Sequence, residues 1–181
     1  MTLLELLRGT LEQLDRGTDA QTIEAWRDKL TRYLNDALFD LSAVNAPKRT
    51  DTLTLTNRAL ALSGLPKRCV KVLALSRNGR RWPFYYGGET SVLYVPNLSD
   101  GDIEVTYRYM PDGMTIDTDV PDLPGQYHSA LILYAVGRER AMGDSASIAA
   151  ARACFELYYA VKRGIRAGHG ELDGYAIENR Y

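Results

Sequence analysis

Four stretches of the chain carry apolar residues at steps of three and four, the spacing of one face of a helix. They predict helices over residues 2–14, 18–42, 127–142 and 145–167. Thr18 and Gln21 are spaced as in a capping box, which predicts the start of the second helix. The third helix is apolar nearly all round, so we expect it to lie buried and covered on more than one face.

Between the second and third helices the apolar period changes from 3.6 to 2. Alternating runs predict five or six short strands, with turn signals at Asn78-Gly79 and Gly87-Gly88. The predicted fold class is therefore α+β: a bundle of about four helices, two N-terminal and two C-terminal, with an inserted small antiparallel sheet or barrel. The predicted division is a helical body (1–46 and 111–169), a β-rich insert (47–110) and an extended C-terminal tail (170–181).

Composition narrows the class of protein. The 181 residues fit one domain, or one core with an inserted subdomain. With 22 lysines and arginines against 23 aspartates and glutamates, the net charge of -1 argues against a dedicated nucleic-acid-binding protein, though not against one that surrounds DNA. Two cysteines, Cys69 and Cys154, favour a reducing compartment. The segment after Met1 lacks the features of a signal peptide, so we expect no leader.

No catalytic signature is present. The chain lacks a phosphate-binding loop, a zinc-protease motif, a nucleophile elbow and a CxxC pair. We interpret His128 and His169 as polar residues at helix ends. The acidic crossover, residues 110–122, lacks the spacing of a calcium loop, and we interpret it as a solvated linker. We therefore expect no cofactor or metal; a small hydrolase using Asp and His residues gathered by the fold remains the enzymatic alternative.

Three features suit contact with partners. Arg77, Arg80 and Arg81 form the densest basic cluster, which suits phosphates or an acidic partner, or is simply a solvated hairpin tip. The C-terminal tail suits an extended peptide that orders on a partner, with a frayed terminus as the alternative. Five aromatic residues gather in the β-rich insert, and we expect most of them in its core and any exposed remainder at an interface: Trp82, Phe84, Tyr85, Tyr86 and Tyr94.

The order of these elements resembles the phage head–tail adaptor (connector) proteins. The match is strongest at Pro121-Asp122-Leu123-Pro124, followed by Tyr127 to Leu131 and by Tyr134-Ala135. The short acidic turn Gly143-Asp144 and a final helix rich in Ala, Tyr and Phe complete the pattern. The pattern is one of packing and contains no catalytic motif, so the resemblance implies a structural protein and not an enzyme.

The resemblance implies a virion protein at the neck of a tailed phage, made in the host cytoplasm. Such an adaptor forms a ring of about twelve copies, a dodecamer, below the portal protein. The ring extends the DNA channel, through which DNA passes without specific binding, and offers a surface to tail or nozzle proteins; no membrane is involved. The alternative is a tail terminator or another neck protein not in direct contact with the portal.

The resemblance also implies roles for three groups of residues. The docking peptide for the portal would be in the tail: Tyr175, Ala176, Ile177 and Tyr181. Contacts between neighbouring copies would involve the charged side of the second helix: Glu24, Arg27, Asp28 and Arg32. The hairpin tip would face the channel or a partner: Arg77, Arg80 and Arg81.

Overall fold

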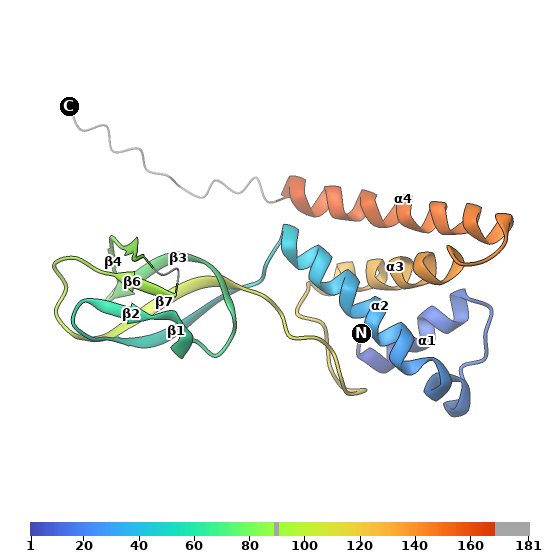
Figure 1. The fold of residues 1–181 in the computed structure, drawn as a ribbon, viewed down its shortest axis with the longest axis horizontal. Helices are drawn as coiled ribbons and strands as arrows, with labels where there is room; N and C mark the ends of the chain where they lie inside the picture. The colour runs from blue at the N-terminus through green and yellow to red at the C-terminus, as the bar shows by residue number, and fades with distance from the viewer. Residues whose placement is uncertain (89–90, 169–181) are drawn as a thin grey trace.

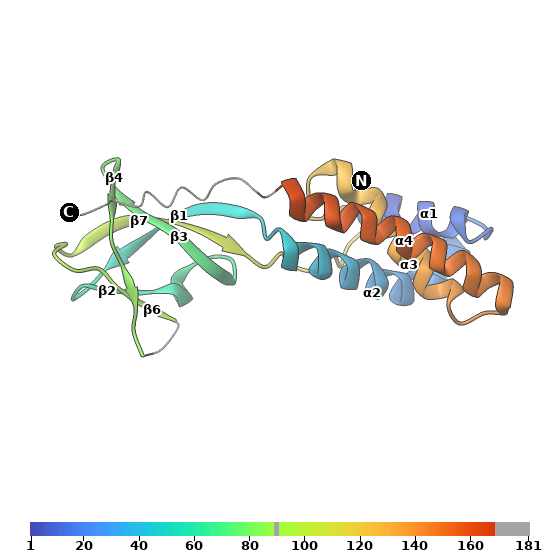
Figure 2. The same ribbon diagram turned by 90° about the horizontal axis from the view of Figure 1, so that it is seen from above.

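The computed structural model describes residues 1–88 and 91–168. Within them, a helical part and a β part lie end to end along the long axis of the molecule (Figures 1 and 2). The helical part contains α1 (Leu3–Gln13), α2 (Ala20–Val44), α3 (His128–Arg140) and α4 (Ser145–Gly168). The β part contains the strands β1 to β7. The predicted α+β fold class is thus confirmed.

Side chains fix where the helices begin. Thr2 and Glu5 form a capping box at α1, each side chain accepting from the other's backbone nitrogen. The predicted Thr18 cap of α2 is wrong, because Asp19 occupies that position and its Oδ1 accepts from the backbone nitrogens of Gln21 and Thr22 at 3.1 and 3.0 Å. The carboxylate accepts from two unpaired backbone donors, and its negative charge interacts favourably with the positive end of the helix dipole. A neutral hydroxyl lacks this charge.

Helix α3 lies at the centre of the helical part, as its apolar pattern predicts. It packs against α4 on one side and against α1 and α2 on the other (Figure 1). Gly9 of α1 allows this approach, since a Cβ there would lie 2.9 Å from Cδ1 of Ile132. The buried residues of α3 join one core shared by all four helices: Ala130, Leu131, Ile132, Ala135 and Val136.

A charged cluster joins α2 directly to α4. The hydroxyl of the fully buried Tyr158 donates to Oδ2 of Asp40 at 2.6 Å, and Nζ of Lys162 donates to both oxygens of the same carboxylate. Burial alone would raise the pKa of Asp40, but the hydrogen bonds from Lys162 and Tyr158 outweigh it and hold this pKa below its usual value. The C-terminal end of α2 is therefore fastened to α4.

Seven strands in the described residues form two antiparallel sheets. One has the order β1-β7-β3-β4 and the other β2-β6-β5. Alternate residues of β7 are buried and pack into one core between the sheets. The strands are β1 (Lys48–Leu55), β2 (Ala59–Ala61), β3 (Cys69–Arg77), β4 (Arg80–Trp82), β5 (Tyr85–Tyr86), β6 (Val92–Tyr94) and β7 (Gly101–Tyr109).

Two turns in the described residues of the β part have positive φ at both central residues, and the sequence predicts only one of them. Asn78 and Gly79 join β3 to β4 with φ of 52° and 75°, as the Asn-Gly signal predicts. Asn57 and Arg58 make a second such turn, with φ of 52° and 61°, inside a stretch that looks like continuous alternation. The carboxylate of Asp100 accepts from both backbone nitrogens of that turn and so holds Arg58 in a conformation that it rarely adopts.

Few polar contacts join the helical part to the β part. The guanidinium of Arg108 on β7 donates to Oδ1 of Asn45 and to the carbonyl of Ala46, at 3.2 and 2.7 Å. Lys67 pairs with Asp112 of the crossover. The two hydrophobic cores share no residue. No helix within the described residues combines the length and apolar character that crossing a bilayer requires.

Candidate interaction surfaces

The charged side of α2 is only partly available to a partner. Arg27 donates to Glu24 and, across the chain, to Asp117 of the crossover. The hydrogen bond to Asp117 has the largest effect, and together with the one to Glu24 it raises the pKa of the Arg27 guanidinium above its usual value. Asp28 and Arg32 are exposed, and neither forms an ion pair with another residue that the structure describes. Of the four residues predicted at a protomer interface, Arg27 holds α2 to its own crossover.

Only two of the three arginines at the hairpin tip are available to a partner. The guanidinium of Arg77 turns inward and donates to the carbonyls of Asp102 and Ser99 at 2.6 and 2.8 Å. Arg80 and Arg81 are exposed, and Cζ of Arg80 lies 5.0 Å from the ring centre of Trp82. The tip therefore presents two arginines to solvent, while the third stabilises the loop before β7.

The aromatic residues of the β part are more exposed than the sequence predicts. Tyr85, Tyr86 and Tyr94 have exposed fractions of 57%, 45% and 37%, whereas Trp82 and Phe84 are half-buried. Tyr85 and Tyr94 stand opposite each other on β5 and β6, with ring centres stacked at 5.6 Å. The expectation of a mainly buried cluster is wrong, because the three-stranded sheet turns one face to solvent. Tyr85 and Tyr94 lie on this face, and we call them the tyrosine patch; Tyr86, opposite the buried Leu93, points to the other face, where its hydroxyl accepts from the backbone nitrogen of Val72.

The acidic crossover is irregular, as predicted, but it is not a free linker. Asp112 pairs with Lys67, and Asp117 with Arg27. The Asp119 carboxylate accepts from the backbone nitrogens of Ile116 and Thr115, which lowers the pKa of Asp119. These carboxylates fold the crossover onto its neighbours. In residues 1–88 and 91–168, no three His, Cys, Asp or Glu side chains gather as a metal ion would require.

The predicted residues of the helix ends and tail have different outcomes. His128 is the first residue of α3, the helix end at which we interpreted it, and its ring is buried. Its Nε2 donates to the carbonyl of Leu123 at 2.9 Å, and its Nδ1 lies 2.9 Å from the backbone nitrogen of Met1. His169 lies outside the described residues, as do the proposed docking residues Tyr175, Ala176, Ile177 and Tyr181.

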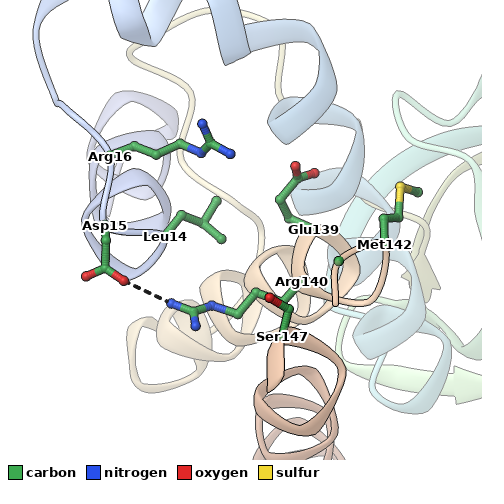
Figure 3. Close-up of a pocket in the computed structure, with 8 residues that line it drawn as sticks. Leu14, Asp15, Arg16, Glu139, Arg140, Met142 and Ser147 are labelled. Atoms are coloured by element: carbon green, nitrogen blue, oxygen red, sulfur yellow. Dashed lines mark hydrogen bonds and ion pairs between the residues drawn. The ribbon is translucent and has the colours of Figure 1, made fainter. Parts of the chain in front are cut away.

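A pocket of about 320 Å³ lies where the turn between α1 and α2 meets the turn between α3 and α4 (Figure 3). Arg140 reaches across it, donating to the carbonyl of Gln13 at 2.6 Å and pairing with Asp15 at 3.3 Å. Glu139 pairs with Lys29 at 2.6 Å. The charged residues that line the pocket thus hold the two turns together. No histidine or cysteine is among the residues that line it.

One flank of α4, beside the side that packs on α3, is a surface that sequence reasoning missed. Six residues lie at steps of three and four along one flank of this helix, and we call them the α4 stripe: Ile148, Arg152, Phe155, Tyr159, Arg163 and Arg166. Tyr159 is 50% exposed and Ile148 39%. The three arginines are exposed and make no ion pair with any described residue. Aromatic residues and arginine are enriched at protein interfaces.

The near-zero net charge hides a strong separation of charge. Residues 47–110 contain ten lysines and arginines and five aspartates and glutamates, a net charge of +5. Residues 1–46 and 111–124 contain five basic and twelve acidic residues, a net charge of -7. Helix α4 returns to +3. Acidic and basic surfaces therefore lie on different elements of one molecule.

Comparison with known proteins agrees with the resemblance found in the sequence. No curated protein sequence matches the chain. The family model described as SU10 adaptor protein matches residues 1–174, nearly the whole chain and both of its parts. This is a family of structural phage adaptors and not a class of enzymes. The chain therefore belongs to the SU10 adaptor protein family.

Proposed function

We propose that this phage adaptor forms a ring below the portal at the head–tail junction, extends the DNA channel and provides the surface to which the tail attaches. The observation that carries this proposal is the placement of exposed aromatic residues on two separate surfaces. The α4 stripe lies on the helical part and the tyrosine patch on the β part. Two such surfaces suit a protein that packs against its own copies and also against other virion proteins.

In this proposal each part of the chain has its own role. The helical body, residues 1–46 and 111–169, forms the ring of about twelve copies around a closed cyclic axis. The β-rich insert, residues 47–110, points toward the channel or the tail and nozzle proteins, with the tyrosine patch as its contact surface. No cofactor is needed, since assembly alone performs the function. The protein resides at the neck of the virion.

Portal docking is assigned to the tail residues Tyr175, Ala176, Ile177 and Tyr181. Their apolar side chains, spaced along polar sequence, favour an extended peptide that orders on its partner. The test is electron microscopy and native mass of the full chain mixed with the portal ring of its own virion. We expect a stoichiometric ring capping the portal, lost when Gly170 to Tyr181 are removed.

The truncated chain should keep the circular dichroism spectrum and melting temperature of the full chain, because the deleted residues lie beyond α4. Portal binding that survives truncation would move the docking site to the helices. Absence of portal binding by the full chain would contradict the adaptor proposal. Binding to an isolated tail tube in that case would establish the tail-terminator alternative.

Contact with DNA is assigned to Arg80 and Arg81, the exposed residues of a β part whose net charge is +5. Each phosphate contact contributes about -0.9 to the slope of log K against log salt concentration. We expect the double substitution R80A/R81A to weaken binding to a labelled duplex and to reduce that slope by about 2. R77A is the matched control, because Arg77 is bonded internally. Equal losses in both variants would contradict a specific role for the exposed pair.

A further inference from the structure

We propose that neighbouring copies meet through two different surfaces: the α4 stripe of one copy and an acidic surface on α2 and the crossover of the next. The acidic surface consists of Glu24 and Asp28 on α2 together with Asp117. This inference rests on the proposed ring and names the surfaces that build it. The occupant of the α4 stripe is thus a second copy of the same chain.

Within the described residues, Phe155 is the stripe residue that packs on α3, its ring edge-to-face with that of Tyr134 at 5.9 Å, whereas Ile148, Tyr159 and the three arginines are exposed. Helix α4 packs the side that carries Ala151, Tyr158 and Ile165 on α3, and the stripe lies on the flank beside it, on a helix whose outer side faces solvent (Figures 1 and 2). Phe155 and Tyr159 lie next to each other on the stripe, with ring centres 6.4 Å apart. Tyr159 is 50% exposed, so about half of the apolar area of this side chain stays in contact with water in the monomer. A partner that covers the stripe removes this area from water.

The acidic surface is well exposed and lies on the far side of α2 from α4. The side chain of Glu24 is 74% exposed and that of Asp117 43%. At 100° per residue, Glu24 and Asp28 lie on the flank of α2 opposite to Asp40, the residue that bonds Lys162 of α4. A chain cannot therefore bring its own stripe to its own acidic surface, so the two can only meet between copies.

Charge complementarity selects a second copy as the occupant. Helix α4 carries a net charge of +3, whereas residues 1–46 and 111–124 together carry -7. The arginines of the stripe have no acidic partner among the described residues, and the acidic surface keeps a net negative charge although Glu24 and Asp117 share Arg27 between them. A contact between two different patches is heterologous, and its repetition gives a ring when the rotation from copy to copy closes. A self-complementary α4–α4 contact would instead place like charges against each other.

A charge exchange tests this pairing. The variant R152E/R163E reverses the stripe, and E24K/D28K reverses the acidic surface. We expect each to weaken self-association about tenfold or more, measured by sedimentation velocity and native mass, with and without the portal ring as a scaffold. The quadruple variant carries both reversals in one chain and should recover assembly, as should an equal mixture of the two double variants. Failure of both to recover would overturn the pairing.

An apolar substitution tests the stripe without changing its charge. Tyr159→Ala should weaken assembly by about tenfold, as truncation of a central aromatic residue does at interfaces. Leu157→Ala is the matched control, since Leu157 is 57% exposed on the same helix but lies on another flank. We expect it to assemble like the parent chain. An equal loss for Leu157→Ala, or no loss for Tyr159→Ala, would contradict the assignment.

The failures of the two proposals can be told apart. If the variant with the reversed stripe binds the portal and also assembles normally, the proposed adaptor function stands and the proposed interface is overturned. If such variants assemble normally but no longer bind tail proteins, the stripe is a tail contact. If the chain self-associates through the stripe but does not bind the portal, the proposed interface stands and the assignment of portal docking is overturned. A parent chain that stays monomeric at high concentration and on the portal overturns the interface.

Discussion

The substitution Leu131→Ala should lower the free energy of unfolding of the helical part by about 2–5 kcal/mol. Leu131 is fully buried on α3, the helix that all three other helices contact, so the cavity opens at the centre of their common core. Urea unfolding followed by the fluorescence of Trp26, which packs against this core, measures the loss. Replacing Trp82 by Phe in both parent and variant removes the signal of the β part.

Two comparisons make this result specific. Leu157→Ala removes the same atoms from an exposed position on α4 and should change stability by no more than about 0.5 kcal/mol. In a Trp26→Phe background, the Trp82 transition should not shift with Leu131→Ala, because Trp82 packs against the other core. A loss below about 1 kcal/mol would contradict the central position of α3. Equal shifts of both transitions would show that the two parts unfold as one unit.

The converse effect is expected for Leu93→Ala in the β part. Leu93 is fully buried on β6, in the core between the two sheets. Its truncation should lower the stability of the β part by about 2–5 kcal/mol, reported by Trp82. The Trp26 transition and self-association through α4 should stay unchanged, since neither surface of the proposed ring contact belongs to the β part.

Val70→Ala is the matched control for Leu93→Ala, because Val70 is 59% exposed on β3 of the same part. It should leave the Trp82 transition nearly unmoved. Loss of ring assembly in Leu93→Ala at a temperature where Trp26 still reports a folded helical part would contradict the separation of roles. Such a result would place the β part within the ring contact.

The helices could be predicted because their apolar residues recur at helical spacing over long segments. The central position of α3 followed from Leu131, Ile132 and Val136, which lie on different sides of one helix and require cover on each. Boundaries were less certain because several residues compete for each end. Asp19 replaced Thr18 as a cap, and Arg58 adopts positive φ only because Asp100 holds its turn.

The interaction surfaces were harder to predict, since exposure depends on tertiary packing. The tyrosine patch has the same strand pattern as a buried cluster, and only the single-sided packing of the three-stranded sheet exposes it. Arg27 and Arg77 look like free charges in the sequence, but Asp117 and the carbonyl of Asp102 bind them. The charge separation was visible in the sequence, yet a sum over the whole chain cancels it.

The measurement that tests the central claim most directly is an electron cryo-microscopy reconstruction of this chain bound to the portal ring of its own virion. We predict a closed ring in which the α4 stripe of each copy, around Tyr159, faces Glu24 and Asp28 of the next. A map in which α4 faces solvent, or pairs with the α4 of a neighbour, would contradict the proposed assembly. A portal ring without this chain at its lower face would contradict the adaptor function itself.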